Sequence, residues 1–503
     1  MQTAPALAGP LAAVDIGSNS MRLEIGQISA AASRYQRVDY LKDTVRLGAG
    51  LDSAGMLGEE ATQRGLACLR RFSARLAGFD PARVRAVATQ TLREAANRDT
   101  FLLRAQEVLG FPIEVISGRE EARLIYAGVA LLQPTRGRRL VLDIGGRSTE
   151  MIVGHGQRPW AAESFAVGCV NLSQRFFGDG RLGAHAFRAA QIAAGAELEE
   201  AQATFRPERW DHALGASGTV GAVSQIVAAA GLSDGRITPA GLRWCIERCI
   251  EAGRSDVLAL PGLRADRRPV LAGGLAILYT LATQFGIDTL QPARGALRQG
   301  VIVDLHERIH GALGTQPGDV RDASVAELQR RFAADAAQAA RVAKVALALF
   351  DDAVPDADIE TRRELAWAAA LHEVGLVVSH HDHHRHSAYL IAHADAAGFS
   401  QSQQRRLGQL VLGQRGGLRK IEPQLASATF AWQLLCLRLA AIMCHARADV
   451  DARALELRVR GRDARLAFPR DGAATRLRTL YLLQEEAAVW ARSGPLRLTL
   501  PEA

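Results

Sequence analysis

Val14-Asp15-Ile16-Gly17-Ser18-Asn19-Ser20 stands near the start of the chain, and Leu142-Asp143-Ile144-Gly145-Gly146-Arg147-Ser148-Thr149-Glu150 repeats its form further along. Each copy is a short apolar run that ends in an aspartate, continues with glycine and small polar residues, and leads into a new run. This pattern predicts a buried strand, a tight loop and a return strand, with a carboxylate where the loop begins. One copy alone would indicate an ordinary hairpin turn, whereas two matched copies favour a binding site.

The residue types in both loops suit a phosphate group and a divalent cation. Glycine lets the backbone approach a ligand closely, and small hydroxyl residues leave backbone N–H groups free to face an anion. An aspartate at such a loop suits Mg2+, which takes a few carboxylate oxygens and keeps several of its waters. We therefore expect the two copies to face each other as a clamp for phosphate and metal.

The composition is that of an ordinary globular protein. Of the 503 residues, 48% are hydrophobic and 23% are charged, and the length favours three or four domains. No apolar run approaches the ~20 residues that span a bilayer. The first thirteen residues lack the basic segment of a signal peptide, and the six cysteines lack metal-ligand spacing. We therefore expect buried thiols and a cytoplasmic location.

The chain is basic, with a formal net charge of +8. All of its basic residues are arginine except Lys42, Lys344 and Lys420. A genomic bias toward arginine is the simpler explanation. The excess also suits a polyanionic partner, because guanidinium groups bind phosphate with two parallel hydrogen bonds.

A second informative stretch is Ser117-Gly118-Arg119-Glu120-Glu121. Ser117 and Glu120 have the spacing of a helix capping box, which explains Glu120 but not Glu121. A carboxylate at position 121 could orient or deprotonate an attacking water at the rim of a phosphate clamp. For Glu150, metal binding, water positioning and pairing with an arginine stay open.

Three arginines and two further stretches have weaker signals. Arg22, Arg93 and Arg267 would act on phosphate only if they converge on one cleft, and each alone is more often a surface residue. Leu271-Ala272-Gly273-Gly274 is predicted to be a small-residue loop. Seven histidines lie between positions 372 and 393, and we expect a polar loop there rather than a metal site.

The chain resembles the exopolyphosphatase and guanosine pentaphosphate phosphohydrolase family, within the superfamily that includes actin and hexokinase. The resemblance spans nearly the whole chain, with several long motifs in the family's order. The motifs are DIGSNS at 15–20, TLREA at 91–95, SGREEARLIYAGV at 117–129, LDIGGRSTE at 142–150, GASGT at 215–219, LHEVGL at 371–376 and HRHSAYL at 384–390.

The resemblance implies an α/β fold in four parts. Two RNase H-like (actin-like ATPase) domains are expected at residues 1–126 and 127–310. An all-helical domain related to His-Asp phosphohydrolases is expected at 311–449, and a small α+β lobe at 450–503. The pattern of the chain is compatible with this, because strands alternate with helices up to about residue 310 and helices follow one another from about 320.

The resemblance also implies roles for particular residues. Glu121 matches the catalytic glutamate, and Asp143 and Glu150 match the metal-associated acids, with Glu150 also a candidate for catalysis. The expected ion is Mg2+ or Mn2+, and a role for K+ stays open. The candidate phosphate contacts are Gly17, Ser18, Asn19, Ser20, Arg22, Arg93, Gly145, Gly146, Arg147, Ser148, Thr149, Ser217, Gly218, Thr219 and Arg267.

Arg147 departs from the family pattern, whose loop usually reads Gly-Gly-Gly-Ser. An arginine cannot take a positive φ as easily as glycine, so either the loop changes shape or a new cation approaches the phosphate. A second departure is Leu412-Gly413-Gln414-Arg415, where long family members often carry Tyr-His-Arg.

The leading hypothesis is a metal-dependent exopolyphosphatase that processively hydrolyses the terminal phosphate of inorganic polyphosphate. The alternative enzyme hydrolyses pppGpp to ppGpp, and both activities share the motifs above. A catalytically weak regulatory protein that binds the alarmone nucleotide is an alternative of another class. A sugar-kinase-like phosphotransferase would need an adenosine-binding loop, which Gly273-Gly274 resembles only weakly. We expect a homodimer and no nucleic-acid partner.

Overall fold

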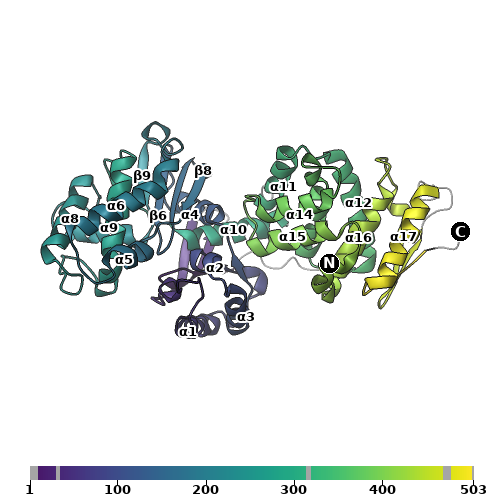
Figure 1. The fold of residues 1–503 in the computed structure, drawn as a ribbon, viewed down its shortest axis with the longest axis horizontal. Coiled ribbons are helices and arrows are strands. Elements are labelled where there is room, and N and C mark those ends of the chain that lie inside the picture. Colours follow the sequence, from purple (N-terminus) through teal and green to yellow (C-terminus); the bar gives the residue numbers. More distant parts are fainter. Residues whose placement is uncertain (1–8, 30–33, 313–318, 468–476, 501–503) are drawn as a thin grey trace. The chain divides into compact units, whose positions relative to one another are not determined.

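The structure is a computed structural model that describes residues 9–29, 34–312, 319–467 and 477–500. The chain divides into two compact units, residues 1–317 and 318–503, which are described separately. Figure 1 labels the helices and strands. Residues 1–8, part of the segment that was predicted to lack a signal peptide, lie outside the described residues. Residues 468–476 and 501–503 of the predicted C-terminal lobe also lie outside them.

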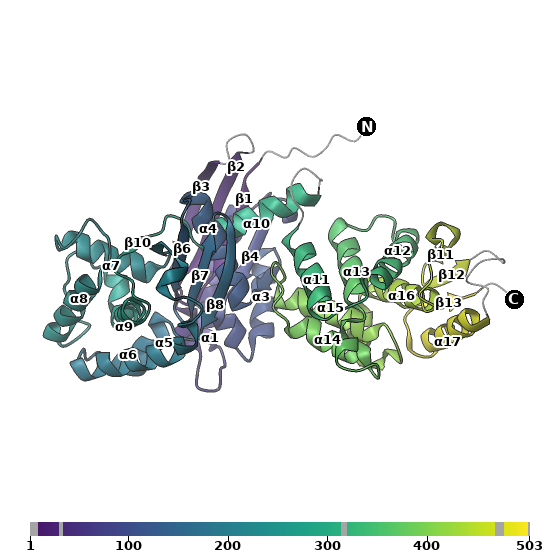
Figure 2. The ribbon, with the colours of Figure 1, turned by 90° about the horizontal axis from the view of Figure 1, so that it is seen from above.

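The first repeated phrase forms the centre of a five-stranded sheet with the order β3-β2-β1-β4-β5. β1, β2 and β3 pair antiparallel, and β4 and β5 continue the sheet in parallel (Figure 2). Loop 1, residues 17–20, joins β1 to β2, and β1 is buried along its whole length. The strands are β1 (Leu11–Ile16), β2 (Met21–Ser29), β3 (Arg34–Asp43), β4 (Val84–Ala88) and β5 (Ile113–Val115).

The second phrase forms the centre of a sheet with the same topology, in the order β10-β9-β6-β7-β8. β6, β7 and β8 pair antiparallel, β9 and β10 add in parallel, and loop 2, residues 145–148, joins β6 to β7. The repeated phrase therefore marks a repeated five-stranded unit, and the predicted α/β fold with two actin-like ATPase domains is confirmed. The strands are β6 (Arg138–Ile144), β7 (Thr149–His155), β8 (Arg158–Phe165), β9 (His212–Gly215) and β10 (Leu290–Pro292).

Two helices lie between the sheets. α4 (Gly118–Leu132) contacts β7 and β8, and α10 (Leu297–Ala312) contacts β1 and β2. The two helices cross closely, since a Cβ on Gly300 would lie 1.7 Å from the carbonyl oxygen of Leu124. Their apolar faces join strand residues of both sheets in one buried cluster. The predicted boundary between residues 126 and 127 thus falls inside a helix that packs against both halves.

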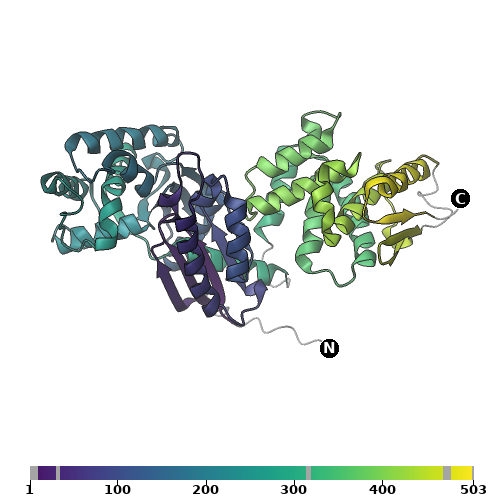
Figure 3. The ribbon, with the colours of Figure 1, turned by 60° about the horizontal axis from the view of Figure 1, so that its bottom comes forward.

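The other helices of this unit pack beside the two sheets. α1 contacts α3 and β2, and α9 contacts α5, α6 and α8. Figure 3 shows purple and blue helices of the first half beside its purple strands. The α-helices are α1 (Glu59–Arg75), α2 (Gln90–Glu94), α3 (Arg98–Leu109), α5 (Cys169–Phe177), α6 (Ala184–Leu198), α7 (Gly218–Ala229), α8 (Pro239–Ala252) and α9 (Arg268–Gln284). The 3-10 helices are η1 (Leu47–Gly50), η2 (Pro81–Arg83), η3 (Glu199–Ala201), η4 (Pro207–Arg209) and η5 (Ala265–Arg267).

The second unit is a helical body followed by a small sheet, as predicted. Its helices surround one buried apolar cluster, and α17 contacts the last strand of the sheet β11-β12-β13. The helices are α11 (Val320–Arg331), α12 (Ala336–Ala353), α13 (Ile359–Leu371), η6 (Val374–Val377), α14 (His383–His393), α15 (Gln401–Gly413), η7 (Leu418–Ala426), α16 (Ala428–Met443), η8 (Ala452–Ala454) and α17 (Leu477–Ser493). The strands are β11 (Glu456–Arg460), β12 (Asp463–Ala467) and β13 (Arg497–Thr499).

The histidine-rich stretch is not a loop throughout. From His383 onward it forms α14, because His383, His384, Ser387 and Ile391 make one buried helix face. Burial lowers the pKa of His383 and His384, the latter to about 4. These two imidazoles are therefore neutral at physiological pH.

In the described ranges, no helix combines the length and hydropathy that are needed to cross a membrane.

Candidate active site

The two repeated phrases fold into hairpins that place four charged residues at equivalent positions. Asp15 lies opposite Arg22 on the pair β1–β2, and Asp143 lies opposite Glu150 on the pair β6–β7. The predicted strand, tight loop and return strand are confirmed in both halves. One hairpin therefore pairs a carboxylate with a cation, and the other pairs two carboxylates.

Backbone hydrogen bonds from neighbouring segments hold both loops. The carbonyl of Ser18 in loop 1 accepts from the N–H of Gly48 at 2.8 Å. The carbonyl of Gly146 in loop 2 accepts from the N–H of Val170, in the first turn of α5, at 2.7 Å. Because these carbonyl oxygens are engaged by the scaffold, they are turned away from any anion that the loops bind.

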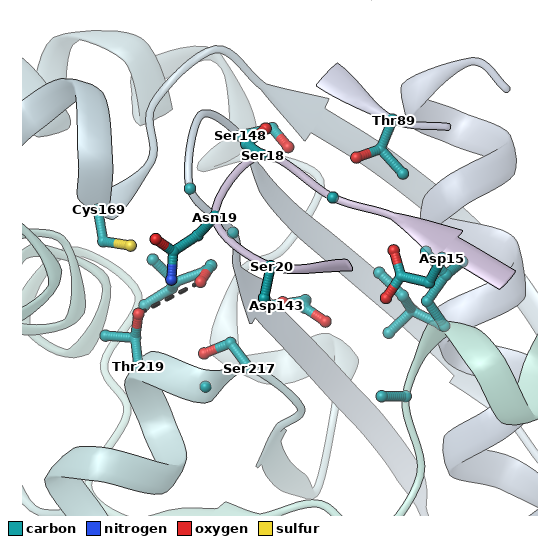
Figure 4. Close-up of a pocket in the computed structure, with 18 of the residues that line it drawn as sticks. Asp15, Ser18, Asn19, Ser20, Thr89, Asp143, Ser148, Cys169, Ser217 and Thr219 are labelled. Atoms are coloured by element: carbon teal, nitrogen blue, oxygen red, sulfur yellow. Dashed lines mark hydrogen bonds between the residues drawn. The ribbon is translucent and has the colours of Figure 1, made fainter. Parts of the chain in front are cut away.

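The two loops meet at one cleft (Figure 4). A Cβ on Gly146 would lie 3.0 Å from the Cβ of Ser18 and 3.4 Å from the backbone nitrogen of Asn19. A larger residue at position 146 would push the loops apart. The expectation that the two copies face each other is met by this close approach.

The N-terminus of α7 forms another wall of the cleft. Ser217 caps this helix, with its Oγ accepting from the N–H of Val220 at 3.0 Å. The Oγ1 of Thr219 donates to the carbonyl of Ile144 at 3.3 Å (Figure 4). The unpaired N–H groups of a helix N-terminus carry a partial positive charge and bind anions. The cleft thus combines two loops and a helix end that suit phosphate.

Two arginines bring positive charge to the cleft. Gly218 makes room for one of them, since a Cβ there would lie 2.3 Å from the Nη2 of Arg267. Arg22 lies 4.0 Å from Asp15, and its buried Nε has no hydrogen-bond partner among the described residues. Burial, followed by the charge of Arg298, lowers the pKa of Arg22. An anion in the cleft would supply the missing acceptor for Arg22.

Three carboxylates, the buried Glu121 and Glu150 and the half-buried Asp143, lie close together at the cleft. Burial raises the pKa of Glu121, and burial together with the charge of Glu121 raises the pKa of Asp143 to about 7. Arg93 donates to Glu121, with 2.8 Å between Nη1 and Oε2. Burial, then the charges of Glu121 and Asp143, raise the pKa of Glu150, whose Oε1 accepts from the Oγ of Ser164 at 2.8 Å. The three acids therefore share an environment that is short of positive charge.

In the first half, the negative charges of Asp15 and Glu24 are paired with Arg298 of α10. The Nη1 of Arg298 lies 3.4 Å from Asp15, and its Nε lies 3.1 Å from Glu24. Gln299 also donates to Glu24, at 2.6 Å. Asp15 is thus paired with cations, whereas the partner of Asp143 across its hairpin is another acid.

Most of the predicted site residues line one cleft. They are Gly17, Ser18, Asn19, Ser20, Arg22, Glu121, Asp143, Gly145, Gly146, Ser148, Ser217, Gly218, Thr219 and Arg267. Arg93, Thr149 and Glu150 are not among the described residues that line it. The Oγ1 of Thr149 donates to the carbonyl of Val167 at 2.6 Å, so this hydroxyl stabilises the fold.

Arg147 is the fourth predicted residue that does not line the cleft. Its φ is not positive, so the replacement of a glycine at this position causes no backbone strain. Its side chain leaves loop 2 and forms an ion pair with Glu94 of the first half, with 2.6 Å between Nη2 and Oε2. The expected new cation beside the phosphate is therefore not seen in this geometry.

A second pocket adjoins the cleft and shares Arg22 and Arg267 with it. Burial, then the charges of Arg267 and Arg22, lower the pKa of Lys42 in this pocket to about 8. The described residues that line the pocket include no carboxylate. The lining residues are Arg22, Tyr40, Lys42, Ala216, Ser217, Gly218, Gly221, Ala222, Gln225, Arg264, Arg267, Ala296 and Arg298.

Sequence reasoning missed Tyr40, Lys42 and Arg298 in this pocket. Tyr40 and Lys42 lie on β3, the edge strand of the first sheet, and Arg298 lies on α10. None of the three follows a motif or a glycine-rich turn. Asp15, which lines the cleft, had a signal, because it occupies the same place in its phrase as Asp143.

The prediction that Leu271-Ala272-Gly273-Gly274 is a loop is wrong, because this stretch lies inside α9. Both glycines serve close packing. A Cβ on Gly273 would lie 2.5 Å from the Oγ of Ser173, and one on Gly274 would lie 2.5 Å from the Cγ2 of Thr219. The stretch therefore offers no adenosine-binding loop, which removes the feature that supported a kinase.

The carboxylates of the cleft fit a divalent cation of the magnesium type. Asp143 and Glu121 line the cleft with raised pKa values, and Glu150 lies opposite Asp143 on the neighbouring strand. Across the described ranges, no three His, Cys, Asp or Glu side chains are grouped closely enough to enclose a metal ion. Mg2+ does not require such a cage, since it binds through one or two carboxylates together with waters and substrate phosphates.

The two matched α/β domains give the protein an actin-like ATPase fold. Its cleft is lined by two loops of small residues, by carboxylates and by arginines. The chain belongs to the Ppx/GppA phosphatase family, whose model matches residues 25–309. Residues 320–486 match the model of domain III of Ppx/GppA phosphatases. Because the members of this family are phosphatases, the protein is a hydrolase.

Two solved structures with TM-scores above 0.5 agree with this fold. An exopolyphosphatase from Cytophaga hutchinsonii is 22% identical with a TM-score of 0.54, covering 62% of this chain and 100% of its own. An exopolyphosphatase-like protein is 24% identical with a TM-score of 0.52, covering 59% and 97%. The PPX-GPPA enzyme of Aquifex aeolicus is 26% identical with a TM-score of 0.49, covering 58% and 98%.

Proposed function

We propose that the protein is an exopolyphosphatase that processively removes terminal orthophosphate from inorganic polyphosphate. The observation that supports this most is the pocket beside the cleft, which continues from Arg22 and Arg267 to Lys42, Arg264 and Arg298. A terminal phosphate held in the cleft would leave the next phosphates of a chain among these cations. Coulomb attraction and charge-assisted hydrogen bonds favour a long polyanion there.

Water would attack the terminal phosphorus in line with the bridging oxygen that leaves. Glu121 would orient this water and accept its proton, since a carboxylate with a raised pKa is a stronger base. As the new P–O bond forms, the bridging P–O bond breaks and the shortened chain leaves with its electron pair. The N–H groups of both loops and of α7, with Arg22 and Arg267, would stabilise the equatorial oxygens.

We further propose that Asp143 holds Mg2+ or Mn2+ from the cleft wall, with Glu150 supporting it from behind. Such an ion, when bound, would shield phosphate charge and lower the pKa of a bound water. The absence of a cation opposite Asp143 on its hairpin supports this assignment. The homodimer, the K+ requirement and the cytoplasmic location stay predictions.

The test is the variant Glu121→Gln, which keeps the side-chain shape and removes the base. We expect phosphate release from long-chain polyphosphate to fall by at least about 100-fold, the usual contribution of a general base. The variant Arg104→Ala is a matched control, because it breaks an exposed ion pair with Glu59 on the helices α3 and α1, away from the cleft. Near-normal release by Glu121→Gln would overturn the proposal.

Hydrolysis of pppGpp to ppGpp is the second candidate, and Tyr40 is the observation that favours it. Its ring lines the second pocket, with the Cζ of Arg298 5.4 Å from the ring centroid. An aromatic ring beside a guanidinium is a suitable surface for a base to stack on. Phosphate release from polyphosphate and from pppGpp, measured on one preparation, separates the two.

A catalytically weak alarmone-binding protein is the candidate of another class. The departure of loop 2 from the family pattern at Arg147 would favour such a protein if this side chain altered the cleft, but it pairs with Glu94 and is not among the described lining residues. Glu121 and Asp143 both line the cleft, which favours a working enzyme. Tight nucleotide binding without turnover of either substrate would support the binding protein instead.

A further inference from the structure

Arg147 connects loop 2 to the first half of the unit. Its Nε and Nη2 lie 2.7 and 2.6 Å from the same oxygen of Glu94, and its Nη1 donates to the carbonyl of Gly48 at 3.2 Å. The side chains of Arg147 and Glu94 are 19% and 29% exposed. This ion pair is therefore partly buried and has fixed geometry, unlike exposed pairs, which contribute little.

Gly48 binds both phosphate loops at once. Its N–H donates to the carbonyl of Ser18 in loop 1 at 2.8 Å, and its carbonyl accepts from Arg147 of loop 2. The contact is tight, since a Cβ on Gly48 would lie 2.9 Å from the Cδ of Arg147 and 3.0 Å from the Cβ of Ser18. Arg147 and Gly48 together hold the two loops at a fixed separation.

A chain of hydrogen bonds leads from this ion pair to Glu121. The other oxygen of Glu94 accepts from the Nε2 of Gln90 at 2.6 Å. The Oε1 of Gln90 accepts from the Nε of Arg93 at 2.8 Å, and the Nη1 of Arg93 donates to Glu121 at 2.8 Å. The three intermediate side chains all belong to the single short helix α2. Each donor and acceptor in the chain is thus oriented by the previous one.

We propose that Arg147 is a positioning residue: it closes loop 2 on loop 1 and, through Glu94, Gln90 and Arg93, fixes the Glu121 carboxylate for the attack of water. This inference rests on the proposed function, in which Glu121 is the base. Without Arg147, Glu94 loses a hydrogen bond and an ion pair, and only the hydrogen bond from Gln90 then orients its carboxylate. The bound phosphate would still meet Arg22, Arg267 and the N-terminus of α7.

The kinetic test compares Arg147→Ala, Arg147→Lys and Glu94→Gln with the control Arg104→Ala, using long-chain polyphosphate. For Arg147→Ala we expect kcat to fall by about 10- to 100-fold, as small misplacements of catalytic groups do, with KM changed less than about threefold. Arg147→Lys should recover part of kcat, because an ammonium can pair with Glu94 but lacks the two-nitrogen fork. The double variant Arg147→Ala/Glu94→Gln should be no slower than the slower single variant.

Three outcomes would overturn the inference. A rise in KM at constant kcat would make Arg147 a phosphate-binding residue. Multiplicative losses in the double variant would show that Arg147 and Glu94 act independently. Unchanged kinetics in Arg147→Ala would show that the hydrogen-bond chain does not influence Glu121.

A second measurement does not depend on catalysis. Amide hydrogen exchange of residues 46–48 and 90–94 should be faster in Arg147→Ala than in the parent, and unchanged in Arg104→Ala. If Glu121→Gln remains active while this exchange is faster, the proposed function fails and the loop closure stands. If the exchange is unchanged, the positioning role fails whatever the activity of Glu121→Gln.

Discussion

Glu150 lies opposite Asp143 on the second hairpin, in the place that Arg22 holds opposite Asp15 on the first. The two halves have the same strand order, so this difference is a difference in charge and not in architecture. The first hairpin directs a cation at the cleft, and the second places the half-buried Asp143 and the buried Glu150 beside Glu121. The duplicated unit thus presents a cation on one hairpin and a second carboxylate on the other.

The acids of the second hairpin predict a pH-dependent stability in metal-free protein. The pKa of Asp143 is raised from 3.8 to about 7 by burial and by Glu121, so the folded state binds more protons than the unfolded state between these values. The free energy of unfolding should therefore fall as the pH rises from about 4 to about 7, by at most about 1.4 kcal/mol per pH unit from this group.

Urea unfolding at several pH values, with chelator, measures this slope. Asp143→Asn should make the decline shallower, and added Mg2+ should stabilise the parent more than the variant at pH 8. Equal slopes in parent and variant would contradict the assignment.

Lys42 predicts a pH dependence of substrate binding. Its pKa is lowered to about 8, by burial and by Arg267 and Arg22, so its charge is lost as the pH rises through 8. KM for long-chain polyphosphate should rise by roughly three- to tenfold between pH 7 and 9, as for the loss of one contact of about 1 kcal/mol. The variant Lys42→Arg keeps its charge in this range and should show a flatter profile. A parent profile as flat as that of Lys42→Arg would contradict the role of this pocket.

Tyr40 should separate the two candidate substrates. Tyr40→Ala removes the ring that lines the second pocket and leaves its cations in place. If this ring stacks a base, the variant should raise KM for pppGpp by about tenfold, the lower end of one stacking contact, with little effect on polyphosphate. The measurement is phosphate release from both substrates by parent and variant. Equal effects on both substrates would argue against base stacking.

Because α4 and α10 cross closely, we expect one added methyl group at their crossing to lower the stability of the protein strongly. Gly300→Ala would place a Cβ 1.7 Å from the carbonyl of Leu124, so the helices must separate, at a cost of about 1–3 kcal/mol or more. Thermal unfolding should show a lower melting temperature. Gly221→Ala in α7 is the control, because nothing lies within 4 Å of its added Cβ, and it should be neutral or slightly stabilising. Equal melting temperatures would mean that this crossing adapts easily.

The local sequence pattern was sufficient to predict those parts of the site that lie within one continuous segment of the chain. The hairpins at Asp15 and Asp143 were predictable because strand, tight loop and return strand are adjacent in sequence. Glu121 was a candidate because a capping box would account for Ser117 and Glu120 only. Ser117 indeed caps α4, whereas the carboxylate of Glu120 pairs with Arg123. The glycines at 273 and 274 were misread, because a glycine in a packed helix and a glycine in a loop have the same local signature.

The sequence by itself determined the duplicated α/β unit, its two phosphate loops and the acids beside them, because these depend on short-range periodicity and on residue chemistry. Only the tertiary structure decided which side chains share the cleft. In the folded chain, Arg147 pairs with Glu94, and Arg298 of α10 pairs with Asp15. Glu150 is not among the described residues that line the cleft. The physical reason is that a side chain's charge partner is set by the packing of elements far apart in the chain, which no local pattern encodes.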